Sequence, residues 1–282
     1  MIDFVKLDIS YLPYEVIKGL DLLEFKSQVN LHTGEVGWPE EAEFNELVFA
    51  CYKKKSYLSG SLHKFLNSIE GRGAQNYDDF SLSMLSRSVQ YLEDKFGIDP
   101  SKTKIVRLEF GINIASEKCP TLFIDENVIS HRKIKTPNID SDYNKKGRYI
   151  QHKMSQCYVK IYDKGRQYGE LKNILRIEVG TKKAQYTQKL GLFTLSDIWK
   201  KDKLLTLGIE LLKRFDKFLI VDHFDEQALP QYWLHLKNTQ CPSTYLRRWK
   251  AFIFKKQSEG QFTLRKSIRK QIEDIWHQLV MN

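Results

Sequence analysis

The stretch VRLEFGINI at residues 106–114 decides the expected fold, because its apolar residues alternate with charged, polar or small ones. Two later stretches, YVKIYDK at residues 158–164 and LRIEV at residues 175–179, show the same alternation. Since successive side chains of a strand point to opposite faces, all three predict strands with one apolar and one polar face. The expected apolar face comprises Leu108, Phe110, Ile112, Ile161 and Ile177. The expected polar face comprises Arg107, Glu109, Asn113, Lys160, Tyr162, Arg176 and Glu178.

The polar face has two interpretations. Antiparallel sheets often expose one face to solvent, and polar residues are ordinary there. Two carboxylates, three cations and a phenol on three strands favour instead an active site built on a rigid sheet. A strand is also expected at residues 2–9, a helix at about 79–96 and mainly helices after about residue 195. We therefore expect an α+β fold, with an antiparallel-dominated central sheet, helices on one face and a mostly helical C-terminal region.

The composition favours an anionic partner. The chain has 282 residues, with 45 Lys and Arg against 35 Asp and Glu, for a net charge of +10. That excess favours nucleic acid over a membrane surface, although a mildly basic surface can also lack functional meaning. The four cysteines lie far apart, without zinc-finger spacing or a disulfide framework, as is typical of reduced cytosolic thiols. With no leader and no stretch long enough to span a membrane, a cytoplasmic protein is expected.

Tyr162 is the candidate nucleophile, since it lies in the middle of the run Lys160 to Lys164. A phenol with a pKa of about 10 is a poor nucleophile at neutral pH. The ammonium groups of Lys160 and Lys164 would favour the phenolate and also attract a phosphate. The competing interpretation is a half-exposed strand tyrosine, and Tyr158 and Tyr168 are rival candidates.

Glu109 and Glu178 are candidate ligands for Mg²⁺ or Mn²⁺, which prefer carboxylate oxygens. Residues four apart on one strand are about 13 Å apart, so a shared ion needs ligands from neighbouring strands, which lie about 4.8 Å apart. Each carboxylate could equally form an ion pair with Arg107 or Arg176.

His63 is the histidine of greatest interest, because it lies in LHKFL at residues 62–66, a run that we expect to form a strand. It could complete a metal site with Glu109, although a structural histidine is the more ordinary role. The sequence contains no His-x-His pair, Walker loop, GxSxG, HExxH or dinucleotide-binding motif.

A basic patch at residues 245–270 is a candidate DNA-binding surface. It contains nine Lys and Arg and one acidic residue, Glu259, with Trp249, Phe252 and Phe254 among them. Such a patch would neutralise phosphates, which supplies most sequence-independent affinity for DNA. An amphipathic helix with a solvated basic face explains the pattern equally well. The basic residues that we expect to contact DNA here are Arg247, Arg248, Lys250, Lys255 and Lys256.

The three strand-like blocks resemble those of rolling-circle replication initiator (Rep) proteins of the plasmid Rep_trans type and, more loosely, of filamentous-phage replication nickases. VRLEFGIN at residues 106–113 is similar to the family strand Arg-Leu-Asp-Leu-Ala-Phe-Asp. YVKIYDK is similar to the segment Arg-Ile-Tyr-Asn/Glu-Lys, and LRIEV to Trp-Arg-Val-Glu. The blocks occur in the family order and cover about residues 105–180. This chain departs from the pattern with Glu109 and Asn113 in place of two aspartates, which leaves the ligand set open.

The resemblance implies an HUH-endonuclease-like fold and a metal-dependent nickase. Tyr162 would attack a phosphodiester, leaving a 5′-phosphotyrosine and a free 3′-hydroxyl. Glu109 would lie in the metal site, and Glu178 would support the ion or orient Arg176. Residues 1–192 would form the nicking and joining domain, and residues 193–282 the helical, basic DNA-binding region.

We accordingly expect a rolling-circle initiator that uses Mg²⁺ or Mn²⁺ held by Glu109, Glu178 and His63. Lys164 and Lys160 would hold the phosphate, and Arg107 and Arg176 would contact DNA. The expected partners are single-stranded or hairpin origin DNA, a host helicase and a second copy of the chain, in a bacterial cytoplasm. The alternatives are a mobilisation relaxase, a single-strand transposase, or a non-catalytic DNA-binding protein with the same fold.

Overall fold

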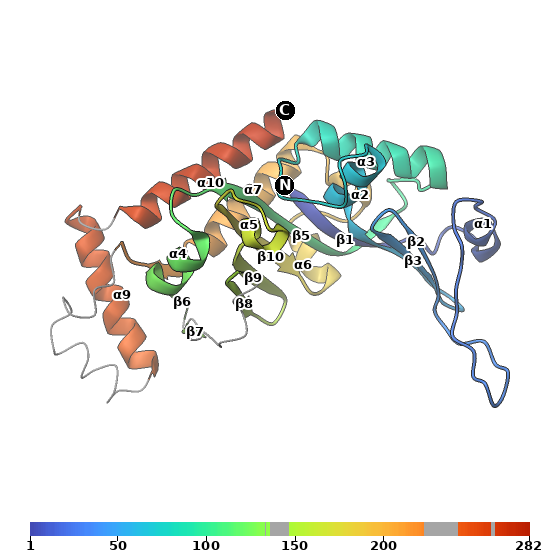
Figure 1. The fold of residues 1–282 in the computed structure, drawn as a ribbon, viewed down its shortest axis with the longest axis horizontal. Helices are drawn as coiled ribbons and strands as arrows, with labels where there is room; N and C mark the ends of the chain where they lie inside the picture. The colour runs from blue at the N-terminus through green and yellow to red at the C-terminus, as the bar shows by residue number, and fades with distance from the viewer. Residues whose placement is uncertain (133, 136–146, 223–241, 261–262) are drawn as a thin grey trace.

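The computed structural model describes residues 1–132, 134–135, 147–222, 242–260 and 263–282. An eight-stranded antiparallel sheet organises the fold (Figure 1), which confirms the predicted α+β class. In spatial order its strands are β2 (Glu40–Phe44), β3 (Leu47–Cys51), β4 (Ser56–Ser61), β1 (Ile2–Asp8), β5 (Lys104–Ala115), β10 (Ile174–Thr181), β9 (Cys157–Asp163) and β8 (Tyr149–Lys153). A small second sheet contains β11 (Phe218–Ile220), β6 (Val128–His131) and β7 (Ile134–Lys135).

The registers of the central strands confirm the two predicted faces. Ile177 of β10 lies opposite Ile112 of β5 on one side and Ile161 of β9 on the other. All three are fully or almost fully buried in one hydrophobic core. The alternation therefore assigned the apolar face correctly, because it depends only on the local period of two residues.

Helices cover the apolar face. These are α2 (Leu62–Ile69), α3 (Leu82–Phe96), α7 (Lys201–Phe215) and α10 (Leu264–Met281). Trp276 of α10 lies against Phe110 of β5, with ring centroids 6.2 Å apart, and its indole N–H donates to the Leu204 carbonyl at 2.9 Å. The remaining helices among the described residues are α1 (Tyr14–Lys18), α4 (Pro120–Asn127), α5 (Lys164–Tyr168), α6 (Ala184–Lys189), a 3₁₀ turn (Leu195–Asp197) and α9 (Pro242–Ser258).

The strand predicted at residues 62–66 is wrong, because this segment begins helix α2. The Ser61 side chain accepts a hydrogen bond from the Lys64 amide and so caps the first turn. Leu62 and Phe65 then lie at helical spacing and are fully buried. The strand in this region is β4, which ends at the capping serine.

The region after residue 192 is mostly helical, as predicted. Leu207 of α7 and Ile272 of α10 belong to the same core cluster as the sheet. The division of the chain into a catalytic domain, residues 1–192, and a DNA-binding region, residues 193–282, stays a prediction. None of the helices in the described ranges combines the length and the apolar character that crossing a membrane requires.

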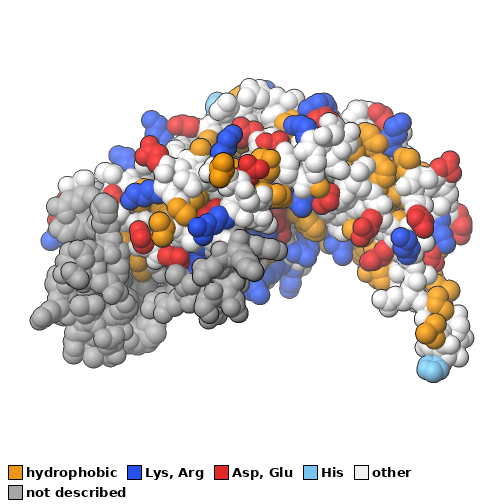
Figure 2. All heavy atoms as spheres, viewed as in Figure 1, with side chains coloured by type: hydrophobic (Ala, Val, Ile, Leu, Met, Phe, Trp, Pro, Cys, Tyr) orange, Lys and Arg blue, Asp and Glu red, His pale blue; other side chains and the backbone are white. Residues whose placement is uncertain are grey.

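A hairpin arm projects from the sheet between α1 and β2 (Figure 1). Backbone bridges join Lys26 to Glu41 and Val29 to Val36 along it. Hydrophobic side chains are exposed towards the tip of the arm (Figure 2), where Leu31 is 94 % exposed.

Candidate active site

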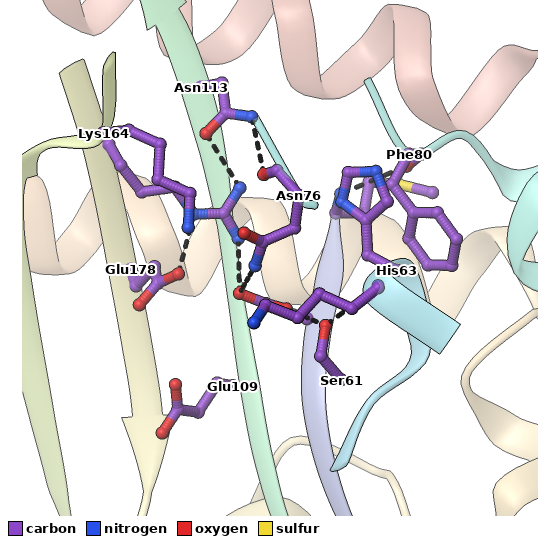
Figure 3. Close-up of polar contacts among 12 residues, drawn as sticks. Ser61, His63, Asn76, Phe80, Glu109, Asn113, Lys164 and Glu178 are labelled. Carbon is purple, nitrogen blue, oxygen red and sulfur yellow. Dashed lines mark hydrogen bonds and ion pairs between the residues drawn. The ribbon is translucent and has the colours of Figure 1, made fainter. Parts of the chain in front are cut away.

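Strands β5, β10 and β9 bring the predicted polar residues together on one face. Arg176 of β10 lies opposite Asn113 of β5 and Tyr162 of β9, and Glu178 lies opposite Lys160. Figure 3 shows Asn113 and Glu178 of this set in front of the sheet, with helices behind it. The predicted polar face is therefore correct at the level of strand register.

Two glycines make room for side chains to lie flat on this face. Gly111 lies opposite Glu178, and a methyl group there would collide with the backbone of Ile177 and the side chain of Glu178. Gly180 lies opposite Tyr158, and a methyl group there would enter the Tyr158 ring. Glu178 and Tyr158 can therefore lie across the neighbouring strands instead of standing upright.

Tyr162 and Glu178 form a buried phenol–carboxylate pair. The Tyr162 hydroxyl donates to Glu178 Oε1 at 3.0 Å, and Arg176 Nε donates to the same oxygen at 2.7 Å. Burial, together with the negative charge of Glu178, raises the pKa of Tyr162 well above its ordinary value. Only 7 % of Tyr162 is exposed, so in this conformation the phenol is protonated and covered.

Arg176 holds the cluster together from within. Its other guanidinium nitrogens donate to Asn113 Oδ1 at 2.9 Å and to Asp3 Oδ2 at 3.3 Å. Asp3 also accepts from Asn76 at 2.8 Å and from the Ser61 hydroxyl. Burial alone would raise the pKa of Asp3, but the charges of Arg176 and Lys164 outweigh it and keep that pKa below its usual range.

The position of Arg176 bears on its predicted contact with DNA. The residue is 2 % exposed, and its donors are directed at Glu178, Asp3 and Asn113. In this conformation its guanidinium holds the Glu178 carboxylate and is buried away from the surface.

Lys164 is a buried amine with a lowered pKa. Its Nζ lies 3.4 Å from the Tyr162 hydroxyl and 5.0 Å from the centre of the Tyr168 ring. Burial, followed by the charge of Arg176, lowers the pKa of Lys164 to about 8. A group that titrates in this range can exchange protons during a reaction near neutral pH.

A second phenol–carboxylate pair lies beside the first. The Tyr158 hydroxyl donates to Glu109 Oε1, and burial together with the charge of Glu109 raises the pKa of Tyr158. The Lys160 ammonium lies 2.7 Å from Glu109 Oε2 and 3.4 Å from Glu178 Oε2. Lys160 therefore links the two pairs.

The three predicted metal ligands do not all come together, because His63 lies apart from Glu109 and Glu178, which share the Lys160 ammonium. His63 Nε2 lies 2.6 Å from Asp78 Oδ1, and its ring stacks on Phe80, away from Glu109 (Figure 3). In the portions of the chain that the structure describes, no three His, Cys, Asp or Glu side chains are arranged to hold a metal ion. The residues therefore do not fit the expected three-ligand site, because His63 is in a helix and an ammonium occupies the space between the two glutamates. A requirement for Mg²⁺ or Mn²⁺ stays a prediction.

The sequence patterns did not predict two members of the cluster, Asp3 and Asn76. Asp3 lies in a strand that the alternation predicted, and an acidic residue among its buried positions was the available signal. Asn76 lies in a loop, where no pattern indicates a partner.

The other predicted DNA-contacting residues lie in two places. Arg107 is half-buried on the polar face, 5.8 Å from the centre of the Phe4 ring. Helix α9 contains the predicted basic residues of the C-terminal patch, of which Arg247, Arg248 and Lys255 have exposed side chains. The side chains of Lys250 and Lys256 lie outside the described part of the structure.

Comparisons with known proteins give similarity in structure and none in sequence. No family model and no curated protein matches the chain. A solved structure, the rolling circle replication initiator protein from Geobacillus stearothermophilus, is similar with a TM-score of 0.37 and 13 % sequence identity. The alignment covers 84 % of this chain and 94 % of that one. A likeness at this level says nothing about the reaction.

Proposed function

We propose that this chain is a rolling-circle replication initiator that cuts one DNA strand and rejoins it through Tyr162. The observation that carries the proposal is the contact of the Tyr162 hydroxyl with Glu178 Oε1 at 3.0 Å, with the Lys164 amine 3.4 Å from the same hydroxyl. A carboxylate that can accept a proton and an amine that can carry a positive charge thus both contact the nucleophilic oxygen of Tyr162. The resemblance of three sequence blocks to Rep initiators supports the choice of DNA as substrate.

The reaction needs one proton transfer on each side of the phosphorus. The phenolic oxygen of Tyr162 attacks the phosphorus of a phosphodiester while its proton passes to the Glu178 carboxylate. The bond from phosphorus to the 3′ oxygen breaks, and that oxygen takes a proton from water, while the Lys164 ammonium beside the attacking oxygen balances negative charge on the phosphate. The products are a 5′-phosphotyrosine and a free 3′-hydroxyl. Attack by a 3′-hydroxyl reverses the steps and rejoins the strand.

Access to the phenol requires a movement of side chains. Tyr149, on the edge strand β8, lies against Tyr162 with ring centroids 5.5 Å apart. Since Tyr162 is 7 % exposed, DNA would reach its oxygen after rotation of the Tyr149 ring or of Tyr162 itself. The Lys164 ammonium, 3.4 Å from the Tyr162 hydroxyl, is then a positive charge beside the incoming phosphate, while the Lys160 ammonium remains between the two glutamates.

Formation of a covalent adduct tests the proposal. Labelled single-stranded oligonucleotides that tile the DNA around the gene are incubated with the protein, with and without Mn²⁺, and analysed on denaturing gels. We expect an adduct with the wild type and a loss of at least about a thousandfold with Tyr162→Phe, which removes the nucleophilic oxygen. Tyr158→Phe and Tyr168→Phe are matched controls that keep the adduct. An undiminished adduct in Tyr162→Phe contradicts the proposal.

The burial of Tyr162 favours a second candidate, a non-catalytic DNA-binding protein with the same fold. The phenol is covered, protonated and hydrogen-bonded, as a structural tyrosine would be. Binding of single-stranded DNA without any adduct, under all metal conditions, would support this candidate. Origin DNA, a host helicase and a second copy of the chain stay the partners that the sequence resemblance implies.

A further inference from the structure

A groove lined by aromatic and basic side chains lies at the opposite end of the sheet from Tyr162. It has a volume of about 730 Å³ and lies at the base of the hairpin arm, against the turn between β3 and β4. Three aromatic side chains and three consecutive lysines line it, and no carboxylate does. These residues are Trp38, Tyr52, Lys53, Lys54, Lys55 and Tyr57.

The turn between β3 and β4 presents the lysines to solvent. The amide of Tyr52 donates to the carbonyl of Lys55 at 2.7 Å, which closes a tight turn. Lys53 and Lys54 lie at its tip, and all three lysine side chains are exposed. Within the described residues, none of the three forms a salt bridge. Three unneutralised positive charges beside exposed aromatic rings form a site for an anionic ligand that can stack.

A line of cation–aromatic pairs connects this groove with the candidate active site. The Lys6 ammonium lies 4.6 Å from the centre of the Tyr57 ring, and Lys6 is the strand partner of Arg107. Arg107 in turn lies over Phe4 and is two residues from Glu109 on the same face of β5. The line crosses strands β4, β1 and β5 in their spatial order and ends beside Lys160 and its two carboxylates.

We infer that this line, from Trp38 to Arg107, is a track that binds a single strand of DNA and leads it to Tyr162. Aromatic rings stack on bases of any sequence, and Lys and Arg neutralise the phosphates between them. From β4 to β9 the sheet is four strand spacings wide, about 19 Å. That distance matches roughly five to six stacked nucleotides at about 3.4 Å each.

The chemistry of the track favours a single strand over a duplex. Tyr52 and Tyr57 meet edge to face with centroids 6.0 Å apart, so their rings offer differently oriented stacking surfaces. Bases of a duplex are already stacked and paired, and their faces cannot reach such rings. That the bound nucleic acid is DNA rests on the proposed function. Binding to the track does not itself require cleavage.

Fluorescence anisotropy with a labelled 12-nucleotide oligothymidylate tests the track. We expect Lys53→Gln/Lys54→Gln/Lys55→Gln to bind about tenfold more weakly, since three phosphate contacts are lost. The slope of log affinity against log salt concentration should become shallower by about 2, at about 0.7 per contact for a single strand. Tyr52→Ala should also weaken binding. Because the Tyr52 side chain is exposed, its truncation should not unfold the sheet.

A control variant loses the same three positive charges at lysines away from the track. Lys189→Gln/Lys201→Gln/Lys217→Gln alters exposed lysines outside the polar face and should leave affinity and salt slope unchanged. Unchanged affinity and slope in the Lys53–Lys55 variant overturn the track, as does tighter binding of a matched duplex or RNA strand. A missing adduct with intact, track-dependent binding would refute cleavage and leave the track standing.

Discussion

Lys160 is the residue on which the charge balance of the polar face depends. Burial alone would lower its pKa, but the carboxylates of Glu178 and Glu109 outweigh this effect and raise the pKa of Lys160 above its ordinary value. Its ammonium therefore stays charged and occupies the position between two acidic oxygens that a cation from solution would otherwise take.

Lys160→Gln should convert this pair of glutamates into a site for a metal ion. Without the ammonium, the two negative charges repel each other, and a divalent ion would relieve that repulsion. We expect Mn²⁺ affinity, measured by electron paramagnetic resonance, to rise at least about tenfold while stability without metal falls by about 1–3 kcal/mol. Lys153→Gln, an exposed position on β8, is the control. Equal Mn²⁺ affinity in variant and wild type would contradict this account.

Lys164 should make stability depend on pH. Its pKa is about 8 in the folded protein and about 10.5 when unfolded, so between these values the unfolded chain binds more protons. The unfolding free energy of the wild type should therefore rise relative to Lys164→Met from pH 8 to pH 10.5, by as much as about 3 kcal/mol. Urea unfolding across this range measures the difference, and a constant difference would refute the shifted pKa.

At the scale of single elements, the start of helix α2 determines where the predicted ligand His63 lies. Residues 62–66 read equally well as a strand by composition, but the hydroxyl of Ser61 caps a helix at this point. The turn from β4 into α2 directs His63 to Asp78 and Phe80 instead of to the sheet face. Because Ser61 starts a helix at this point, the His63 side chain does not lie at the expected metal site.

The glycines of β5 and β10 show the same dependence on neighbouring elements. Gly111 and Gly180 interrupt otherwise strong strand patterns, and the sequence offers no reason for them. Only the pairing of the strands reveals that each provides space for Glu178 or Tyr158. The function of a glycine in a strand therefore depends on what its neighbour places opposite.

At the scale of the whole molecule, the C-terminal helices support the sheet from behind. Trp276 of α10 contacts both Phe110 of β5 and the Leu204 carbonyl of α7. Gly208 is tightly packed against the same indole, which leaves no room for a larger residue. Strands β5, β9 and β10 and the helical region therefore share one core.

Trp276→Ala should destabilise the sheet and the C-terminal helices together. The loss of a buried tryptophan costs about 3–5 kcal/mol through lost burial and the cavity left behind. We expect hydrogen exchange in β5, β10 and α7 to accelerate by a similar factor. Phe193→Ala, at an exposed side chain, is the control and should change little. Faster exchange confined to the helices would instead support separate units divided at residue 192.

By itself, the sequence determined the class of the fold, the two faces of the central strands and the set of polar residues on one of them. These follow from alternation within a strand, a local property that one chain displays without an alignment. Tertiary structure alone decided which polar groups touch. Asp3 meets Arg176 across 173 positions of sequence, and Lys160 lies between two glutamates from different strands. Such contacts depend on how strands pair and where loops close, and no local period of the sequence encodes either one.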